Sequence, residues 1–136
     1  MAKMSAEEIQ GHLAQFTGTE DWHQFSGMFK SVIATDGAME MAKICEAYWL
    51  LDLVASHQRK ISRKHGITGL HFQHWTIKKR PRAGGFIVSC DDGNGNKLAT
   101  QTVPHSDFPM DEFSFYCNLA QRGVRIIMTI LLKTEY

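Results

Sequence analysis

The chain has 136 residues, of which 43% are hydrophobic and 21% charged, and a formal net charge of +1. These values are ordinary for a globular protein, so the composition argues against disorder and predicts a single domain over residues 1–136. No apolar run approaches the roughly 20 residues that cross a bilayer, and residues 1–10 lack the apolar stretch of a secretion signal. Three cysteines without CxxC spacing favour reduced thiols, and we expect a cytoplasmic protein.

The first half of the chain, residues 1–66, is predicted to be mainly helical. Ser5, followed three residues later by Glu8, has the pattern of a capping box and begins a helix over residues 5–15. Residues 20–34 are spaced as a short helix followed by an extended apolar stretch.

A long helical segment follows. Thr35 or Asp36 is a suitable N-cap, and no helix breaker follows up to about residue 61. Residues 47–55 are apolar almost all round, which indicates a central helix that is covered on most sides. The sequence leaves open whether residues 37–60 form one helix or two.

The second half, residues 67–136, changes to a period of two and is predicted to form an antiparallel sheet. Five strands are expected, at about residues 70–79, 84–91, 97–103, 113–119 and 124–132. Short turns at 92–95 and 120–123 imply that consecutive strands are neighbours. The predicted fold class is therefore α+β, with two to three N-terminal helices packed on a C-terminal antiparallel meander of about five strands.

Catalytic and metal-binding patterns are weak. His71 and His74 lie three apart, a spacing that points to opposite faces of a strand, so no metal site is predicted. No phosphate-binding glycine loop is present, and no cofactor is expected. The catalytic candidates are Asp52, His57 and Asp36. We expect Asp52 to be buried in its apolar helix, where a structural ion pair is favoured over catalysis.

Positive charge is concentrated in the middle of the chain. Residues 53–90 contain eight of the fifteen lysines and arginines and no acidic residue, which leaves seven bases against fourteen acids elsewhere. The eight cations are Arg59, Lys60, Arg63, Lys64, Lys78, Lys79, Arg80 and Arg82. Together with Trp75 they form the predicted binding surface. Phe72, His74 and Trp75 could offer stacking faces if their strand is exposed.

Three interpretations of this segment stay open. The first four cations lie at a predicted helix C-terminus, where they complement the helix dipole, and the last four flank a hairpin, where charge discourages edge-to-edge association. Alternatively, they form a surface for a protein partner or for the phosphates of a nucleic acid. One contiguous patch would favour binding, and two separate clusters would favour the structural explanation.

Several short motifs in chain order resemble a known family. They are Phe16-Thr17-Gly18-Thr19-Glu20 with Trp22, Thr35-Asp36-Gly37, Ala47-Tyr48-Trp49-Leu50-Leu51-Asp52 with Ala55-Ser56-His57-Gln58, Phe72-Gln73-His74-Trp75, Asp107-Phe108-Pro109 and Glu135-Tyr136. In these the chain is similar to a small, functionally uncharacterised domain family of bacteria, phages and other mobile elements.

The resemblance implies a setting rather than an activity, because small proteins carried by mobile elements often bind and block host machinery. We therefore expect a non-catalytic interaction protein that binds, and could inhibit, a host macromolecular complex. A nucleic-acid-binding module that uses the basic residues 59–82 is the first alternative, and an enzyme with a site near Asp52 and His57 is the second. A protein is the expected partner, nucleic acid is a second candidate, no membrane association is expected, and self-association is compatible with the sequence.

Overall fold

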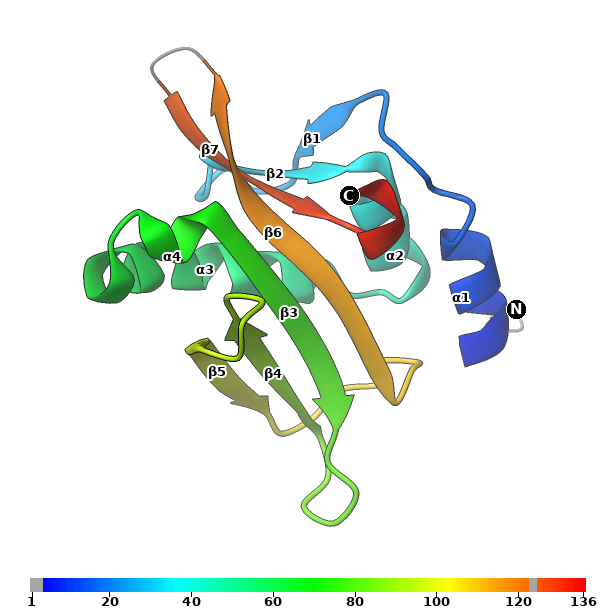
Figure 1. Cartoon of the computed structure of the whole chain (residues 1–136). Helices are drawn as coiled ribbons and strands as arrows, with labels where there is room; N and C mark the ends of the chain where they lie inside the picture. Colours follow the sequence, from blue (N-terminus) through cyan, green and yellow to red (C-terminus); the bar gives the residue numbers. More distant parts are fainter. Residues whose placement is uncertain (1–3, 123–124) are drawn as a thin grey trace.

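The computed structural model describes residues 4–122 and 125–136. Within these residues the chain forms four α-helices, a sheet of seven strands and a short 3₁₀ helix (Figure 1). The helices are α1 (Ala6–Leu13), α2 (Asp36–Ile44), α3 (Tyr48–His65) and α4 (Thr68–His71), and the 3₁₀ helix is Lys133–Glu135. The strands are β1 (Trp22–Gln24), β2 (Val32–Thr35), β3 (Phe72–Lys79), β4 (Phe86–Asp91), β5 (Lys97–Val103), β6 (Glu112–Arg122) and β7 (Arg125–Leu131).

The α+β class is confirmed, and the five predicted strands correspond to β3 to β7, but they do not form a meander and the sheet has two further strands. The strand order is β1-β2-β7-β6-β3-β4-β5, and β2 runs parallel to β7. The strands β3, β4 and β5 follow one another as in a meander, and β6 pairs antiparallel with β7 as expected, but β6 crosses back to pair with β3 on the side away from β4. The expected hairpin turn at 120–123 lies partly outside the described residues.

The extended apolar stretch predicted at the end of residues 20–34 is strand β2, but the predicted short helix before it is wrong, because strand β1 lies there and pairs antiparallel with β2. Strand β2 then joins β7, with Val32 beside Met128 and Ala34 beside Ile130. The helical half of the chain thus contributes two strands to the sheet. This pairing joins residues almost a hundred positions apart, so local spacing gives no sign of it.

The open question about residues 37–60 is answered by a break between α2 and α3. Cys45 caps α2, and Glu46 then adopts a positive φ of 52°. The N–H of Ala47 donates to the carbonyl of Ala42 (2.8 Å), which closes the end of α2 before α3 begins at Tyr48. This change of direction lets both helices cover the same face of the sheet.

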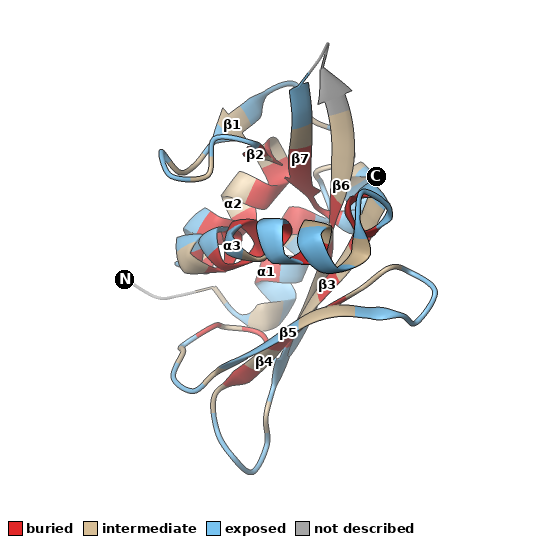
Figure 2. Cartoon of the chain, turned by 90° about the vertical axis from the view of Figure 1, so that its left-hand side faces the viewer, coloured by how far each residue is buried: buried red, intermediate tan, exposed pale blue. Residues whose placement is uncertain are grey.

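The described helices and strands form two layers, and no described α-helix covers the second face of the central sheet. In Figure 1, α2 and α3 lie behind the sheet, and the middle of β3 and β6 faces the viewer. Figure 2 shows that buried residues concentrate where these helices meet the sheet, whereas the hairpins at its lower end are largely exposed.

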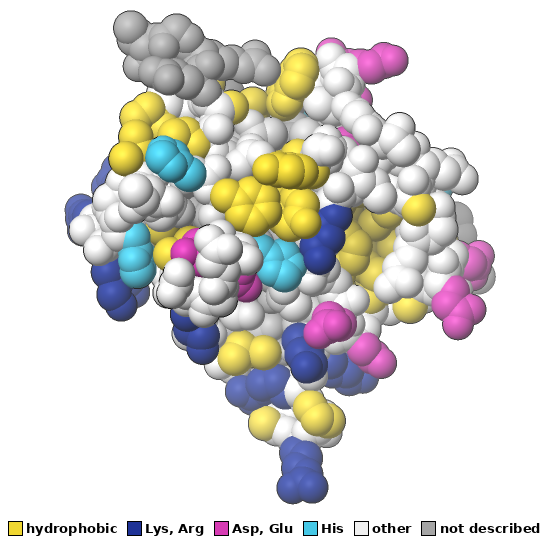
Figure 3. Space-filling view, viewed as in Figure 1, with side chains coloured by type: hydrophobic (Ala, Val, Ile, Leu, Met, Phe, Trp, Pro, Cys, Tyr) yellow, Lys and Arg dark blue, Asp and Glu magenta, His cyan; other side chains and the backbone are white. Residues whose placement is uncertain are grey.

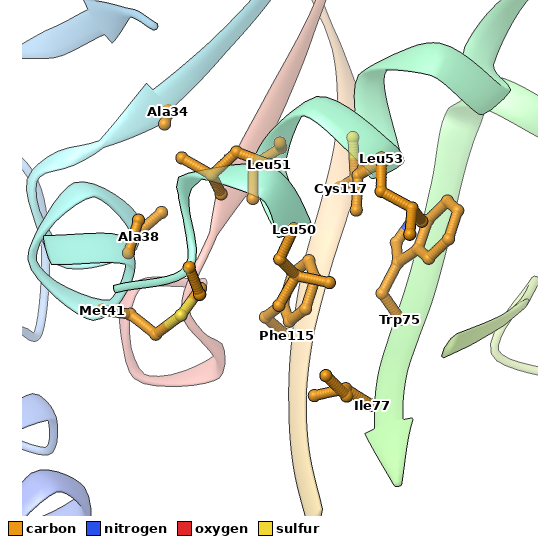
Figure 4. Close-up of a cluster of buried hydrophobic side chains, with 14 of the residues drawn as sticks. Ala34, Ala38, Met41, Leu50, Leu51, Leu53, Trp75, Ile77, Phe115 and Cys117 are labelled. Atoms are coloured by element: carbon orange, nitrogen blue, oxygen red, sulfur yellow. The ribbon is translucent and has the colours of Figure 1, made fainter. Parts of the chain in front are cut away.

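The core lies between α3 and the covered face of β3 and β6 (Figure 4). Leu50 and Leu53 of α3 meet a layer formed by Trp75 of β3 and by Phe115 and Cys117 of β6. Because side chains alternate along a strand, burying Trp75 and Phe115 on this face turns their neighbours His74, Thr76 and Tyr116 to the open one.

Candidate interaction surface

The start of α2 is held by a network around Asp36. The Asp36 carboxylate accepts hydrogen bonds from the Nε2–H of His23 (2.7 Å) and from the backbone N–H of Glu20 (3.0 Å), while its own N–H donates to Oγ1 of Thr19 (2.9 Å). The hydrogen bond from His23, followed by that from Glu20, lowers the pKa of Asp36 to about 2. Asp36, one of the three catalytic candidates, therefore serves to join β1 and its preceding loop to α2.

A second carboxylate closes the same helix end from the opposite terminus of the sequence. Glu135 accepts from the hydroxyl of Thr35 (2.6 Å), from the N–H of Gly37 (3.0 Å) and from the N–H of Leu132 (3.0 Å). Thr35, one of the two residues predicted as possible N-caps, is the N-cap and accepts from the N–H of Ala38 (3.2 Å). A Cβ on Gly37 would lie 2.5 Å from Oε1 of Glu135, so any larger residue at this position would have to displace the carboxylate.

A buried amide pair joins α3 to β3. Gln58 and Gln73 exchange two hydrogen bonds of 2.8 Å, and the indole N–H of Trp75 donates to Oε1 of Gln73 (2.9 Å). Both amides also donate to main-chain carbonyls, those of Val54 and Gly69 (3.0 Å each). These buried polar groups are thus satisfied, which gives the two glutamines a structural role.

The open face of the sheet carries an aromatic cluster of Phe72, Tyr116 and Tyr136. The ring centroids of Phe72 and Tyr116 are 4.8 Å apart, and Tyr136 meets them at 5.6 and 5.2 Å, respectively, edge to face. Tyr136 is 72% exposed, although tyrosine carries a large apolar ring. In Figure 3 a hydrophobic group lies at the centre of this face, with a histidine and a cationic side chain beside it. We call these three residues the aromatic platform.

The charged residues around the aromatic platform are largely matched. The ammonium of Lys133 lies 5.7 Å from the centre of the Tyr116 ring, a cation–π contact. Nδ1 of His74 is 3.3 Å from Asp91, and Lys78 is 3.9 Å from Glu112. Between them, Thr76 and Ser114 share a hydrogen bond of 3.1 Å. The face is therefore aromatic at one end and polar beyond it, with charges of both signs.

Sequence reasoning missed the aromatic platform as a site. Phe72 was predicted as a stacking face beside His74 and Trp75, but Tyr136 was only part of a motif and Tyr116 was not singled out. The alternation of side chains along β3 and β6 could have indicated it, since Phe72 and Tyr116 both occupy outward positions on these neighbouring strands. Tyr136 could not be placed, because nothing local sets its position against β3.

Two expectations about individual side chains are corrected. Trp75 is fully buried against α3, so it cannot belong to an exposed binding surface in this structure. Asp52 is exposed rather than buried, because Tyr48, Asp52 and Ser56 follow the helical spacing along the outer side of α3. The apolar residues around Asp52 led to the wrong expectation, because they concealed the helical spacing of these three exposed residues.

The remaining catalytic candidates do not assemble within the described part of the chain. No hydrogen bond or ion pair joins any two of Asp36, Asp52 and His57 there. His57 donates instead to the side-chain carbonyl of Gln101 on β5 (2.6 Å).

The eight predicted cations form two groups. Arg59, Lys60, Arg63 and Lys64 occupy the last turns of α3, whereas Lys78, Lys79, Arg80 and Arg82 lie at the end of β3 and in the hairpin to β4. The start of β3 lies near the end of α3, where the first group is, and the second group lies at the other end of this strand. Because β3 has eight residues and is about 26 Å long, the two groups are well apart. The hairpin group also includes acidic neighbours, since Asp111 and Glu112 line the same hollow as Lys78 and Lys79.

Other chemistry on the described residues is limited. No group of three histidine, cysteine or acidic side chains there is arranged to hold a metal ion. Cys45, Cys90 and Cys117 are buried free thiols, and burial raises the pKa of each, to about 12 for Cys45. No helix in the described ranges is long and apolar enough to cross a bilayer.

Comparison with known proteins places the chain in a family. A model of a family of unknown function, DUF6876, matches residues 7–136. The chain belongs to this family. No curated protein and no solved structure matches the chain. The match covers the α2 network, the buried amide pair and the aromatic platform.

Proposed function

We propose that this DUF6876 domain is a non-catalytic interaction protein that binds a protein partner through the uncovered face of its sheet. The observation that carries the proposal is the aromatic platform: three ring side chains in mutual contact, the outermost 72% exposed, on a face that no described helix covers. Tyrosines packed into a cluster and surrounded by polar groups are typical of the centre of a protein interface.

The charges on this face favour a protein over a nucleic acid. A phosphate backbone needs cations that lack acidic competitors. Here His74 has Asp91 as its neighbour, and Lys78 has Glu112. A protein surface can match both signs, set an apolar side chain against the rings and hydrogen-bond to Thr76 and Ser114.

The proposed setting remains that of a phage or other mobile element, in which such a protein would bind and block a host complex. This part of the proposal rests on the resemblance described above. Inhibition would then follow from occupying a partner's surface, without any turnover.

The proposal is tested with one variant and one matched control. Tyr136→Ala removes the exposed ring of the aromatic platform, and Tyr48→Ala removes a 46% exposed tyrosine from the outer side of α3. Proteins captured from host lysate by the wild type are purified, and their affinities for all three forms are measured by calorimetry. We expect a partner whose binding weakens about tenfold or more with Tyr136→Ala and is unchanged with Tyr48→Ala.

Three outcomes would overturn the proposal. One is a partner that binds the wild type and Tyr136→Ala equally well. Another is a stable dimer of the wild type that Tyr136→Ala dissociates, since a second copy would then occupy the face. The third is a nucleic acid that competes with the partner for the platform.

A further inference from the structure

A groove between α3 and β5 lies on a different part of the molecule from the aromatic platform. It is a hollow of about 360 Å³, a volume within the range of ligand sites. Its lining residues are His57, Lys60, Ile61 and Lys64 from α3 and Lys97, Leu98, Ala99 and Thr100 from β5. We call it the α3–β5 groove.

The chemistry of the α3–β5 groove is that of an anion site with an apolar floor. Ile61 is buried, and Leu98 and Ala99 are partly buried, whereas Lys60, Lys64 and Lys97 are exposed. No acidic side chain is among the described residues that line it. This differs from the hollow at the β3–β4 hairpin, where two acidic residues accompany the lysines.

The dipole of α3 does not account for this charge. A helix C-terminus carries about half an elementary negative charge, whereas Lys60 and Lys64 bring two positive charges to the groove from the last two turns of α3, and Lys97 adds a third from β5. Beyond the groove, Asp91 is the cross-strand partner of Lys97, and Asp92 lines an adjoining hollow together with Lys97. The Asp91 carboxylate is hydrogen-bonded to His74 and to the N–H of Gly93, and the Asp92 carboxylate accepts from Asn94 and Asn96. Lys60 and Lys64 face no acidic side chain among the described residues that line the groove, so their charge is available to a ligand.

We propose that the α3–β5 groove binds single-stranded nucleic acid, with a base on the floor of Ile61, Leu98 and Ala99 and phosphates on the lysine rim. Lys60 and Lys64 are four residues apart, about 6 Å along the helix, which matches the close spacing of charges along a strand. The bases of a duplex are stacked inside it and cannot reach such a floor, so a single strand fits better. This inference is independent of the protein interface proposed above.

The test is fluorescence anisotropy with a labelled oligothymidylate of twelve nucleotides, titrated from low to high salt. The groove variant is Lys60→Gln with Lys64→Gln, and Lys97→Gln is a second variant on the opposite wall. The matched control is Lys30→Gln with Lys43→Gln, which removes the same charge from two exposed lysines elsewhere. A duplex and a polyglutamate peptide are competitors.

We expect wild-type binding that weakens with salt, a loss of about tenfold or more in the groove variant, and a salt slope reduced by about 1.4 for two lost phosphate contacts. Lys97→Gln should reduce the slope by about half as much. The control and Tyr136→Ala should bind as the wild type does, which separates this result from the protein interface.

The proposal is overturned if the wild type fails to bind at 50 mM salt or if the control loses as much affinity as the groove variant. It is also overturned if the duplex binds as tightly as the single strand, or if polyglutamate competes as well as the oligonucleotide, because the groove would then select for charge alone. The double variant Lys79→Gln with Arg80→Gln tests the hairpin. If it loses as much affinity for the oligonucleotide as the groove variant does, the oligonucleotide binds at the hairpin and the proposal is wrong.

Discussion

The side-chain carboxylate of Glu135 accepts a hydrogen bond from the backbone N–H of Gly37, 98 residues earlier in the chain (3.0 Å). A negative charge at the first turn of a helix is favourable, because unpaired N–H groups and the dipole both point there. Asp36 anchors the preceding loop to the same turn. Three motifs that are separated in the sequence, around Thr19, around Asp36 and at Glu135, thus meet at the first turn of α2. Their hydrogen bonds to one another give these residues a structural role.

Gly37→Ala should destabilise the protein. The added Cβ would lie 2.5 Å from Glu135 and 2.8 Å from Leu132, so the carboxylate must move and its hydrogen bonds weaken. We expect a loss of about 1–3 kcal/mol in the free energy of unfolding by urea. Gly11→Ala in α1 is the control: its Cβ meets nothing within 4 Å, and a gain of about 0.5–1 kcal/mol is expected. Equal effects of the two changes would contradict the contact.

Gln73→Leu should lower the free energy of unfolding by more than an ordinary polar-to-apolar substitution in the core does. It leaves the indole N–H of Trp75 and the amide of Gln58 without their partner in a buried site. The expected loss is about 2–4 kcal/mol in urea unfolding, since each unpaired buried group costs about 1–3 kcal/mol. Gln15→Leu, at an exposed position, should be nearly neutral. The buried network would be disproved by a Gln73→Leu protein as stable as the wild type.

Asp36→Asn should remove part of the acid sensitivity of the fold. The pKa of Asp36 is lowered in the folded state to about 2, from 3.8, chiefly by His23. Its ionised form therefore stabilises the fold fully above about pH 4, and this contribution is lost as the pH falls towards 2. The stability difference between the wild type and Asp36→Asn, measured by thermal unfolding, should shrink between pH 5 and pH 2. A constant difference would refute the role of this carboxylate.

The three thiols should be unreactive until the protein unfolds. Cys45, Cys90 and Cys117 are at most 4% exposed, and burial raises the pKa of each thiol above its ordinary value. The thiolate is the reactive form. At pH 8, an aromatic disulfide reagent should label less than one thiol per chain under native conditions and three in urea. Rapid native labelling would show that one of these sites opens readily.

Local signals in the sequence were sufficient for most elements but not for their arrangement. The Ser5 cap and the turn after Asp91 depend on neighbours within a few residues and were predicted, and the cap of α2 was narrowed to Thr35 or Asp36. The pairing of β2 with β7 and of β6 with β3 depends on contacts between distant segments, which no local period encodes.

The predicted site residues show the same limit. The helical spacing of Tyr48, Asp52 and Ser56 could have placed Asp52 on the outer side of α3, but the apolar residues between them dominated the interpretation. The alternation of Gln73, Trp75 and Ile77 could have shown that Trp75 shares the buried face. The meeting of Tyr136 with Phe72 could not have been foreseen, since it requires the folded sheet.

The most direct test of the central claim is side-chain footprinting by hydroxyl radicals, with the purified protein partner present and absent. If the uncovered sheet face is the interface, the partner should protect Phe72, Tyr116 and above all the exposed Tyr136, while Tyr48 on the outer side of α3 stays as reactive as in the free protein. Protection of Tyr48 with Tyr136 left reactive would contradict the account.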